Sequence, residues 1–217
     1  MNLTVSLILG SSILVAAVIL AVRLGWLHPR FLPFVCLVFV GVIAEVFNSY
    51  MVLSGNANII VINIYSLFEA GLIAWQFDRW GLFGKNKLVL PTILGIMILV
   101  WVSENFIWGS FSDFNSIFIV ACAYPIVIAS IAMINSLLSD DRQRLNRNPI
   151  FVICIAFIFY FTYTVLVETF WFYGFDESPV FAARIYNIFF YVNFLTNILY
   201  AVAALWIPRK PNYILPY

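Results

Sequence analysis

Charged residues are scarce in this sequence. Only 10% of its 217 residues are Asp, Glu, Lys or Arg, and the formal net charge is +1, whereas soluble domains carry about 25% charged residues. The hydrophobic fraction is 64% and the mean hydropathy is +1.02. This composition excludes a soluble globular domain, and the lack of any basic arm argues against a nucleic-acid partner. We expect an integral membrane protein whose main partner is the lipid bilayer.

Residues that build metal sites and disulfide frameworks are equally scarce. The chain has one histidine, His28, and three cysteines, all within apolar stretches. One imidazole excludes the His-based zinc hydrolases, and three scattered thiols give no disulfide framework. The sequence contains no Gly-rich phosphate loop, nucleophile elbow or zinc-protease motif, and its last apolar stretch has no lysine for a retinal Schiff base. We therefore expect neither a cofactor nor a metal.

Long apolar runs are what the sequence has in abundance. A helix that crosses a bilayer needs about 20 mainly apolar residues. We predict an all-α fold of seven transmembrane helices that form one domain over residues 1–217. The predicted spans are Leu3–Val22, Phe31–Leu53, Ile59–Leu82, Leu88–Trp108, Ser116–Leu138, Ile150–Tyr173 and Ala182–Ile207.

The basic residues predict the orientation of these helices, because Lys and Arg concentrate in cytoplasmic loops. Ten of the eleven basic residues fall on one side, and Arg184 alone falls on the other. We therefore expect the N-terminus outside and the C-terminus inside, in the cytoplasmic membrane of a bacterium.

The predicted topology resembles the 3+1+3 layout of sugar transporters of the SWEET type and of the nicotinamide riboside permeases. In that layout the fourth helix links two three-helix halves. The resemblance rests on the number and order of the seven spans alone, because the chain carries no motif of either family. It implies a carrier of small solutes.

Ionisable side chains inside the apolar segments are the strongest functional signal, since a charge at the bilayer centre costs at least about 2.5 kcal/mol on insertion scales. Four of the five glutamates lie inside predicted helices: Glu45, Glu69, Glu104 and Glu168. From the helical rise of about 1.5 Å per residue, Glu69 falls near the midplane and the others in the outer half. We expect the four carboxylates to line one cavity open to the outside. Desolvation predicts that Glu69 holds a proton at rest.

Other polar and aromatic side chains extend this candidate site. Arg184, at the start of the last span, is the expected counter-ion of Glu104 or Glu168. Aromatic faces and carboxylates together can hold a cation, although interfacial belts of Trp and Tyr and polar contacts between helices explain the same residue types. The remaining residues of the candidate site are Asn63, Asn187, Tyr191, Asn193, Trp108 and Trp171.

Three functions fit these features, and we place the first ahead of the others. A small-solute transporter, for a cationic or proton-coupled solute, would bind its ligand in the cavity and use protonation of Glu69 for coupling. A receptor or binding subunit would signal to a protein partner through the basic loop Ser139–Pro149. An enzyme acting on a lipid would use two carboxylates as general acid and base.

The shape of the cavity discriminates between these functions. A cavity that reaches both faces in alternate states indicates transport, and a cavity closed below Glu69 indicates a receptor. A lateral opening flanked by two glutamates indicates the enzyme.

Cysteine labelling tests the predicted orientation. Cysteines introduced at Ser112 and Gln143 should react with a membrane-impermeant thiol reagent from opposite sides, because the two positions lie in loops on opposite faces of the membrane. The measurement compares right-side-out with inverted vesicles. Labelling of both positions from the same side would contradict the predicted topology.

Overall fold

The computed structural model describes residues 3–139, 145–172 and 179–210, and its regular elements in these ranges are helices. Seven helices of the described chain are long and apolar enough to cross a membrane, which confirms the predicted number of spans. The main elements are α1 (Leu3–Gly10), α2 (Ile13–Arg23), α3 (Leu32–Leu53), α4 (Ile59–Trp80), α5 (Val89–Ser103) with the π-helical turn η3 (Glu104–Trp108), α6 (Ser116–Leu138), α7 (Pro149–Phe172) and α8 (Pro179–Trp206).

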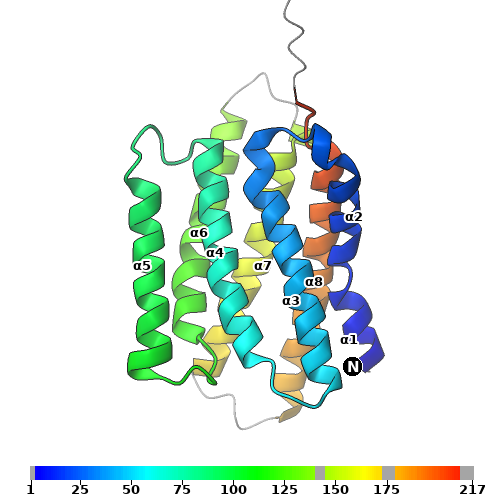
Figure 1. Ribbon diagram of the computed structural model, residues 1–217, viewed down its shortest axis with the longest axis vertical. Helices are drawn as coiled ribbons and strands as arrows, with labels where there is room; N and C mark the ends of the chain where they lie inside the picture. The colour runs from blue at the N-terminus through cyan, green and yellow to red at the C-terminus, as the bar shows by residue number, and fades with distance from the viewer. Residues whose placement is uncertain (1–2, 140–144, 173–178, 211–217) are drawn as a thin grey trace, which may run out of the picture.

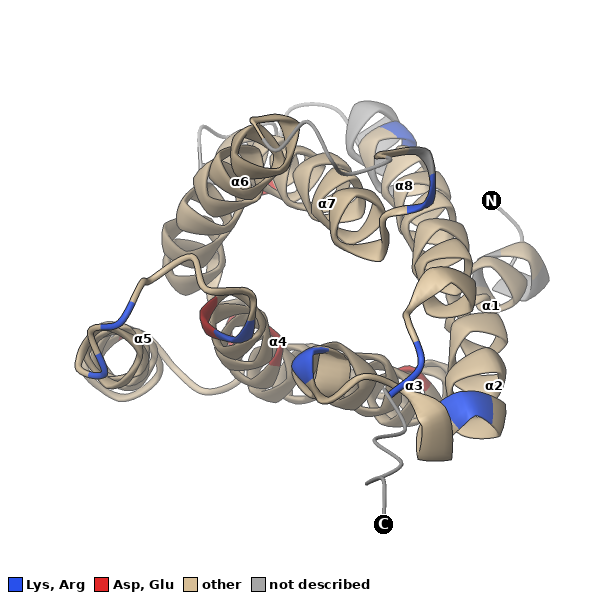
Figure 2. Ribbon diagram, turned by 90° about the horizontal axis from the view of Figure 1, so that it is seen from above, with Lys and Arg blue, Asp and Glu red and all other residues tan. Residues whose placement is uncertain are grey.

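All spans but one form a ring (Figures 1 and 2). α2 packs on α3 and α8, α3 packs on α4, and α4 touches α6, which packs on α7; α7 in turn packs on α8. α5 stands outside the ring against α4 and α6, and none of its residues is buried. The helices α2, α3 and α4 therefore form one half of the ring, and α6, α7 and α8 form the other half.

The first span is not one continuous helix. We predicted a single helix over Leu3–Val22, but the structure divides it at Ser11 and Ser12 into α1 and α2. The Ser11 hydroxyl donates to the carbonyl of Ile8 at 3.0 Å and the Ser12 hydroxyl to that of Leu9 at 2.6 Å. Such local hydrogen bonds compete with the helical backbone pattern and bend or break helices. They explain why the first span is two helices and not the single helix that we predicted.

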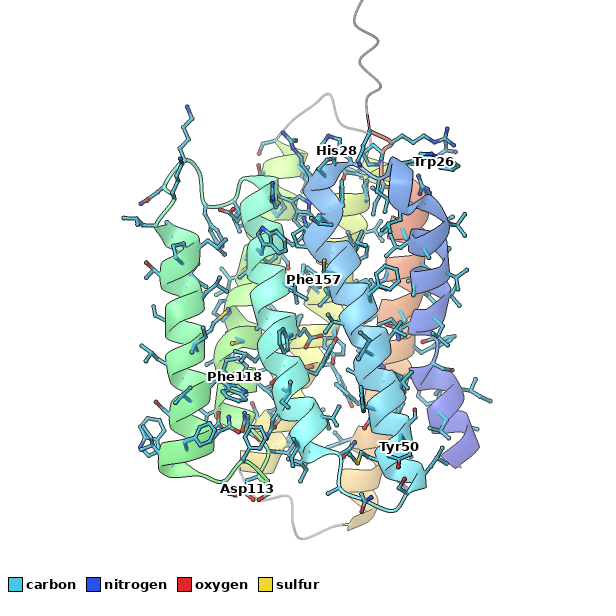
Figure 3. All side chains as sticks on the ribbon, in the orientation of Figure 1. Trp26, His28, Tyr50, Asp113, Phe118 and Phe157 are labelled. Atoms are coloured by element: carbon cyan, nitrogen blue, oxygen red, sulfur yellow. The ribbon has the colours of Figure 1, made fainter. Side chains whose placement is uncertain are left out.

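The hydrophobic core fills the ring at the end where α2 finishes and α3 begins. Its centre is a group of aromatic side chains from four helices: Phe34, Phe77, Phe157 and Tyr200. The ring centroids of Phe34 and Tyr200 are 5.4 Å apart, and those of Phe77 and Phe157 are 6.0 Å apart. All four side chains are buried, so this end of the ring is closed. In Figure 3, Phe157 lies in the half of the bundle that also carries Trp26 and His28.

The described basic residues gather at this same end of the bundle, which is at the top of Figure 1, with the exception of Arg184. Each lies at a helix end or in a connecting segment there. Arg142 and Arg144, and the labelling position Gln143, lie outside the described residues. The basic residues of this end that the structure describes are Arg23, Arg30, Arg79, Lys85, Lys87, Arg147, Arg209 and Lys210.

The first and last spans are tied together at the basic end. The N–H of His28 donates to the carbonyl of Pro208 at 3.1 Å, and the N–H of Lys210 donates to that of Trp26 at 2.8 Å. The Arg23 guanidinium donates to the carbonyl of Ile207 at 2.8 Å, just beyond the C-terminal end of α8, where a positive charge is favourable. These contacts close the ring between α2 and α8.

Gln76 holds the start of α3 against α4. It is 1% exposed, its side-chain oxygen accepts from the Phe34 N–H at 2.7 Å, and its side-chain nitrogen donates to the carbonyl of Arg30 at 2.8 Å. The first N–H groups of a helix have no partner within the helix. Gln76 therefore supplies one of the partners that the buried start of α3 requires.

We predict that Gln76→Leu destabilises the protein. Leucine keeps most of the volume but leaves the buried Phe34 N–H and Arg30 carbonyl without this partner, at a cost of about 1–3 kcal/mol. Thermal unfolding in detergent measures the effect. Ser54→Ala, which removes an exposed hydroxyl, is the control and should unfold close to wild type. Equal melting temperatures for wild type and Gln76→Leu would show that this hydrogen bonding does not stabilise the fold.

Candidate functional site

A cavity of about 600 Å³ lies inside the ring. Its walls come from α3, α4, α6, α7 and α8, and from the α1–α2 break. Sites for small molecules usually measure about 300–1,000 Å³. The cavity is therefore large enough for a small organic molecule and much larger than a bare ion needs.

The cavity opens at the end of the bundle opposite the basic loops. Its lining includes Asn58, directly before α4, Ser116, the first residue of α6, and Phe114, whose side chain is 47% exposed. These residues lie at the end of the bundle where Figure 3 labels Tyr50 and Asp113. The rim is therefore formed by the loops of the less basic end.

The other end of the cavity is closed by the aromatic core. Tyr200 lines the cavity and also packs on Phe34 and Phe157, with centroid distances of 5.4 and 6.1 Å. Phe34 and Phe157 are both 0% exposed. We call Tyr200, Phe34, Phe77 and Phe157 the floor of the cavity. The floor separates the cavity from the basic end of the bundle.

Three glutamates line the cavity, Glu45 from α3, Glu69 from α4 and Glu168 from α7. The hydroxyl of Tyr65, one helical turn away, donates to Oε1 of Glu69 at 2.9 Å. The Glu45 carboxylate packs against Gly10, where an added Cβ would overlap it. None of the described lining residues is Lys, Arg or His. The cavity is thus acidic, and the described part of its wall supplies no counter-ion.

The break in the first span forms part of the cavity wall. Gly10 and Ile13, on either side of the break, both line the cavity. The side-chain amide of Asn197 on α8, another lining residue, donates to the Ser12 hydroxyl at 2.9 Å. The broken backbone is therefore held between Glu45 on one side and Asn197 on the other.

Thr196 brings a neutral polar group to the wall. Its side chain lines the cavity and is 2% exposed, and its hydroxyl oxygen has no hydrogen-bond partner in the described protein. Buried hydroxyl groups are normally hydrogen-bonded, because an unpaired one costs free energy. The Thr196 hydroxyl is therefore a buried hydrogen-bonding group at the cavity wall that the described protein leaves unused.

Of the residues predicted from the sequence, the structure brings four together in the cavity. Trp108 is 73% exposed and lies outside it, Tyr191 is exposed, and the side chain of Trp171 lies outside the described part of the chain. Asn187 does not line the cavity either. The four that do are Glu45, Glu69, Glu168 and Asn193.

Glu104 has a different position from the one we expected. It does not line the cavity, because its carboxylate caps the start of α6. Its Oε1 accepts from the N–H of Ile117 at 2.9 Å and its Oε2 from the N–H of Phe118 at 2.6 Å. A carboxylate at a helix N-terminus satisfies free N–H groups and faces the positive end of the helix dipole.

Asn63 organises the connection between α5 and α6. The side chain is 0% exposed. Its amide nitrogen donates to the carbonyl of Asp113 at 2.7 Å, and its amide oxygen accepts from the N–H of Asn115 at 3.3 Å. The Trp101 indole donates to the backbone carbonyl of Asn63 at 2.9 Å. Asn63 therefore stabilises a loop near the rim and does not face a ligand.

Arg184 is exposed at the start of α8 and does not line the cavity. No direct ion pair joins it to Glu104 or Glu168 among the side chains that the structure describes. A surface position explains this, because a guanidinium can reach water there and needs no buried partner. The expected direct pairing is therefore not found.

Apart from Asn193, the sequence analysis missed the parts of the site that do not involve glutamates. Thr196 and the α6 wall, with Phe118 and Cys122, come from segments that look like ordinary apolar helices. Gly10 did carry a signal, because Gly-Ser-Ser interrupts an apolar run at positions 10–12. Such an interruption inside a membrane span is a pointer to a binding site.

The cap on α6 predicts different effects for two glutamates at similar depth. Glu104→Ala should lower the melting temperature in detergent, because loss of a capping side chain costs about 0.5–2 kcal/mol. Glu168→Ala should not lower it to the same extent, because Glu168 faces the cavity. A larger loss of stability from Glu168→Ala than from Glu104→Ala would be the opposite of this expectation.

Comparisons with known proteins assign neither a family nor a function to this chain. No protein-family model, curated protein or solved structure matches this chain. A function has to be inferred from the chemistry of the cavity itself.

Proposed function

We propose that this protein transports a small solute, that the solute binds in the cavity, and that Glu69 exchanges a proton during transport. The observation that carries the proposal is one cavity of about 600 Å³ inside an apolar bundle, with three carboxylates on its wall and a closed floor. Alternating access requires a site within the membrane that is open to one side at a time. The cavity, with its closed floor, has the shape expected of such a site when it is open to one side only.

The broken first span supports a transporter. Many carriers bind their solute beside discontinuous helices, because the interrupted backbone presents polar groups at the depth of the membrane. Here Gly10 and Ile13, which flank the break, line the cavity. The break is the kind of element that changes shape when a bound solute is passed on.

The position of Glu69 supports a role in proton exchange. It lies on α4 beside the floor of the cavity, and both Glu69 and Tyr200 line the same space. Its hydrogen bond from the Tyr65 hydroxyl is the only one that the described residues make to its carboxylate. Ionisable residues buried within membrane helices are typical of proton relays and substrate pathways.

Transport requires the floor to open. The floor contacts are edge-on packings of aromatic rings, such as Phe34 on Tyr200 at 5.4 Å, and such rings separate without breaking an ion pair. In the 3+1+3 arrangement that we propose, the helices before α5 and those after it move relative to each other. The position of α5 outside the ring supports its use as a linker.

The distribution of basic residues supports an orientation in which the cavity opens to the outside. The basic end of the bundle is the end beyond the floor, and basic loops face the cytoplasm. We therefore propose that the cavity opens to the outside, and we keep a bacterial cytoplasmic membrane as the proposed location.

A receptor or binding subunit is the second candidate, and the closed floor favours it. A cavity that ends at a packed aromatic core can hold a ligand without passing it on. Signalling would then run through the loop Ser139–Pro149, of which residues 140–144 lie outside the described chain.

Solute uptake into proteoliposomes tests the proposed function. With an imposed pH gradient and the radiolabelled solutes choline, glycine, glucose and acetate, we expect uptake of one class above that of protein-free liposomes. Glu69→Gln should abolish the accumulation, because glutamine cannot exchange a proton. The measurement is the initial rate of uptake.

Asp78→Asn is the matched control, because Asp78 lies on the same helix but does not line the cavity. It should keep wild-type uptake. Accumulation that survives in Glu69→Gln would remove Glu69 from the mechanism. Binding of a solute without any accumulation would replace transport by the receptor function.

A further inference from the structure

From the lining of the cavity we infer the class of its ligand, an organic ammonium ion with a small apolar body. This inference rests on the proposed function, because it assumes that the cavity binds a ligand. Three features carry it: the charge of the wall, the aromatic rings beside the carboxylates and the free hydroxyl of Thr196.

The charge of the wall selects for cations. Glu45, Glu69 and Glu168 come from three different helices and face one space, and no described lining residue is basic. An anionic or zwitterionic ligand with a carboxylate or phosphate would find no cation to bind. A positive ligand offsets the cost of ionising a carboxylate away from water, because opposite charges attract strongly where the dielectric constant is low.

The aromatic rings fit an organic cation. Tyr160 lies between Phe161 and Phe189, at centroid distances of 5.1 and 5.7 Å, and all three line the cavity. Ring faces attract ammonium groups and also pack on alkyl groups. Glu168 projects from the same helix as Tyr160, two turns further along. Rings and carboxylates therefore contribute to the same wall.

The Thr196 hydroxyl is the third sign of a ligand and is independent of the other two. It lines the cavity from α8, is 2% exposed, and has no hydrogen-bond partner in the described protein. A hydroxyl oxygen can accept a hydrogen bond from an ammonium N–H or donate to a ligand oxygen. Thr196 therefore favours primary to tertiary ammonium ions, which retain N–H groups, over quaternary ones.

A metal ion does not fit the site. In the part of the chain that the structure describes, no three His, Cys, Asp or Glu side chains come close enough to hold one. Calcium takes about 6–8 oxygen ligands at short distances, whereas the carboxylates here are spread around about 600 Å³. The volume suits an organic body that fills the space between them.

The native thiol of Cys122 allows a direct test, because Cys122 lines the cavity. The experiment uses purified protein in detergent with Cys36 and Cys154 replaced by alanine. Two methanethiosulfonate reagents of similar size are compared, one with a trimethylammonium group and one with a sulfonate group. We expect the ratio of the cationic to the anionic modification rate to exceed that of free cysteine about tenfold or more, because an acidic cleft concentrates cations.

Three comparisons make the test specific. Combined Glu45→Gln, Glu69→Gln and Glu168→Gln substitutions should bring the ratio close to that of free cysteine. Butylammonium chloride should slow the modification more than calcium chloride or sodium acetate at equal concentration. Thr196→Val, which keeps the shape of the side chain, should weaken protection by butylammonium while leaving protection by tetramethylammonium unchanged.

Because Cys122 is 6% exposed, the same measurements are made with Ser116→Cys at the rim. A ratio equal to that of free cysteine at both positions, or stronger protection by calcium than by butylammonium, overturns the inference. If neither position reacts with either reagent, the cavity is not accessible, and the inference and the proposed function both fail. Cation selectivity without solute uptake in proteoliposomes removes the transport function alone.

Discussion

Hydrocarbon offers no hydrogen-bond partner, so each polar group in a membrane-spanning helix must find one inside the protein or face water. This constraint organises the molecule. With only 10% charged residues, the chain has few groups to satisfy, and the ring of helices turns most of the polar ones inward. At the basic end the interior of the ring holds a packed aromatic core in place of polar side chains. At the other end the ring encloses a cavity, and α5 stands outside because its surface is apolar enough to face lipid.

The inward-facing polar groups fall into two sets with different consequences. Gln76, Asn63 and Glu104 each bond backbone groups of a neighbouring segment, and their bonding capacity is used by the fold. Glu45 and Thr196 line the cavity and, among the described residues, bond no backbone group of a neighbouring segment. The Glu45 carboxylate is hydrogen-bonded to the Asn48 side chain, whereas the Thr196 hydroxyl has no hydrogen-bond partner in the described protein. An unsatisfied group inside a membrane protein is costly to keep. We take the second set as the candidates for ligand binding, because these side chains line the cavity and are not used to hold neighbouring segments together.

Helical periodicity and hydropathy were enough to predict the seven spans, because a span needs only length and apolar composition. They were not enough to separate Glu104 from Glu168, which lie at similar depth. That distinction depends on which groups each carboxylate meets in three dimensions: Glu104 bonds the first N–H groups of α6, whereas Glu168 faces the cavity. The break at Ser11 and Ser12 was missed because two serines in an apolar run are compatible with a continuous helix. Thr196 was missed because a lone threonine carries no charge to mark it.

The helices that carry the ligand-facing groups also carry the floor. On α8, Thr196 lies one turn from Tyr200, and on α4, Glu69 lies about two turns from Phe77. A helical turn rises about 5.4 Å, so these pairs move as parts of rigid helices. A cation that draws Glu69 and Thr196 together would therefore shift Phe77 and Tyr200, which pack against Phe157 from two sides. If the cavity binds a cation as we propose, its occupancy would act on the floor, because α4 and α8 carry residues of both the cavity wall and the floor.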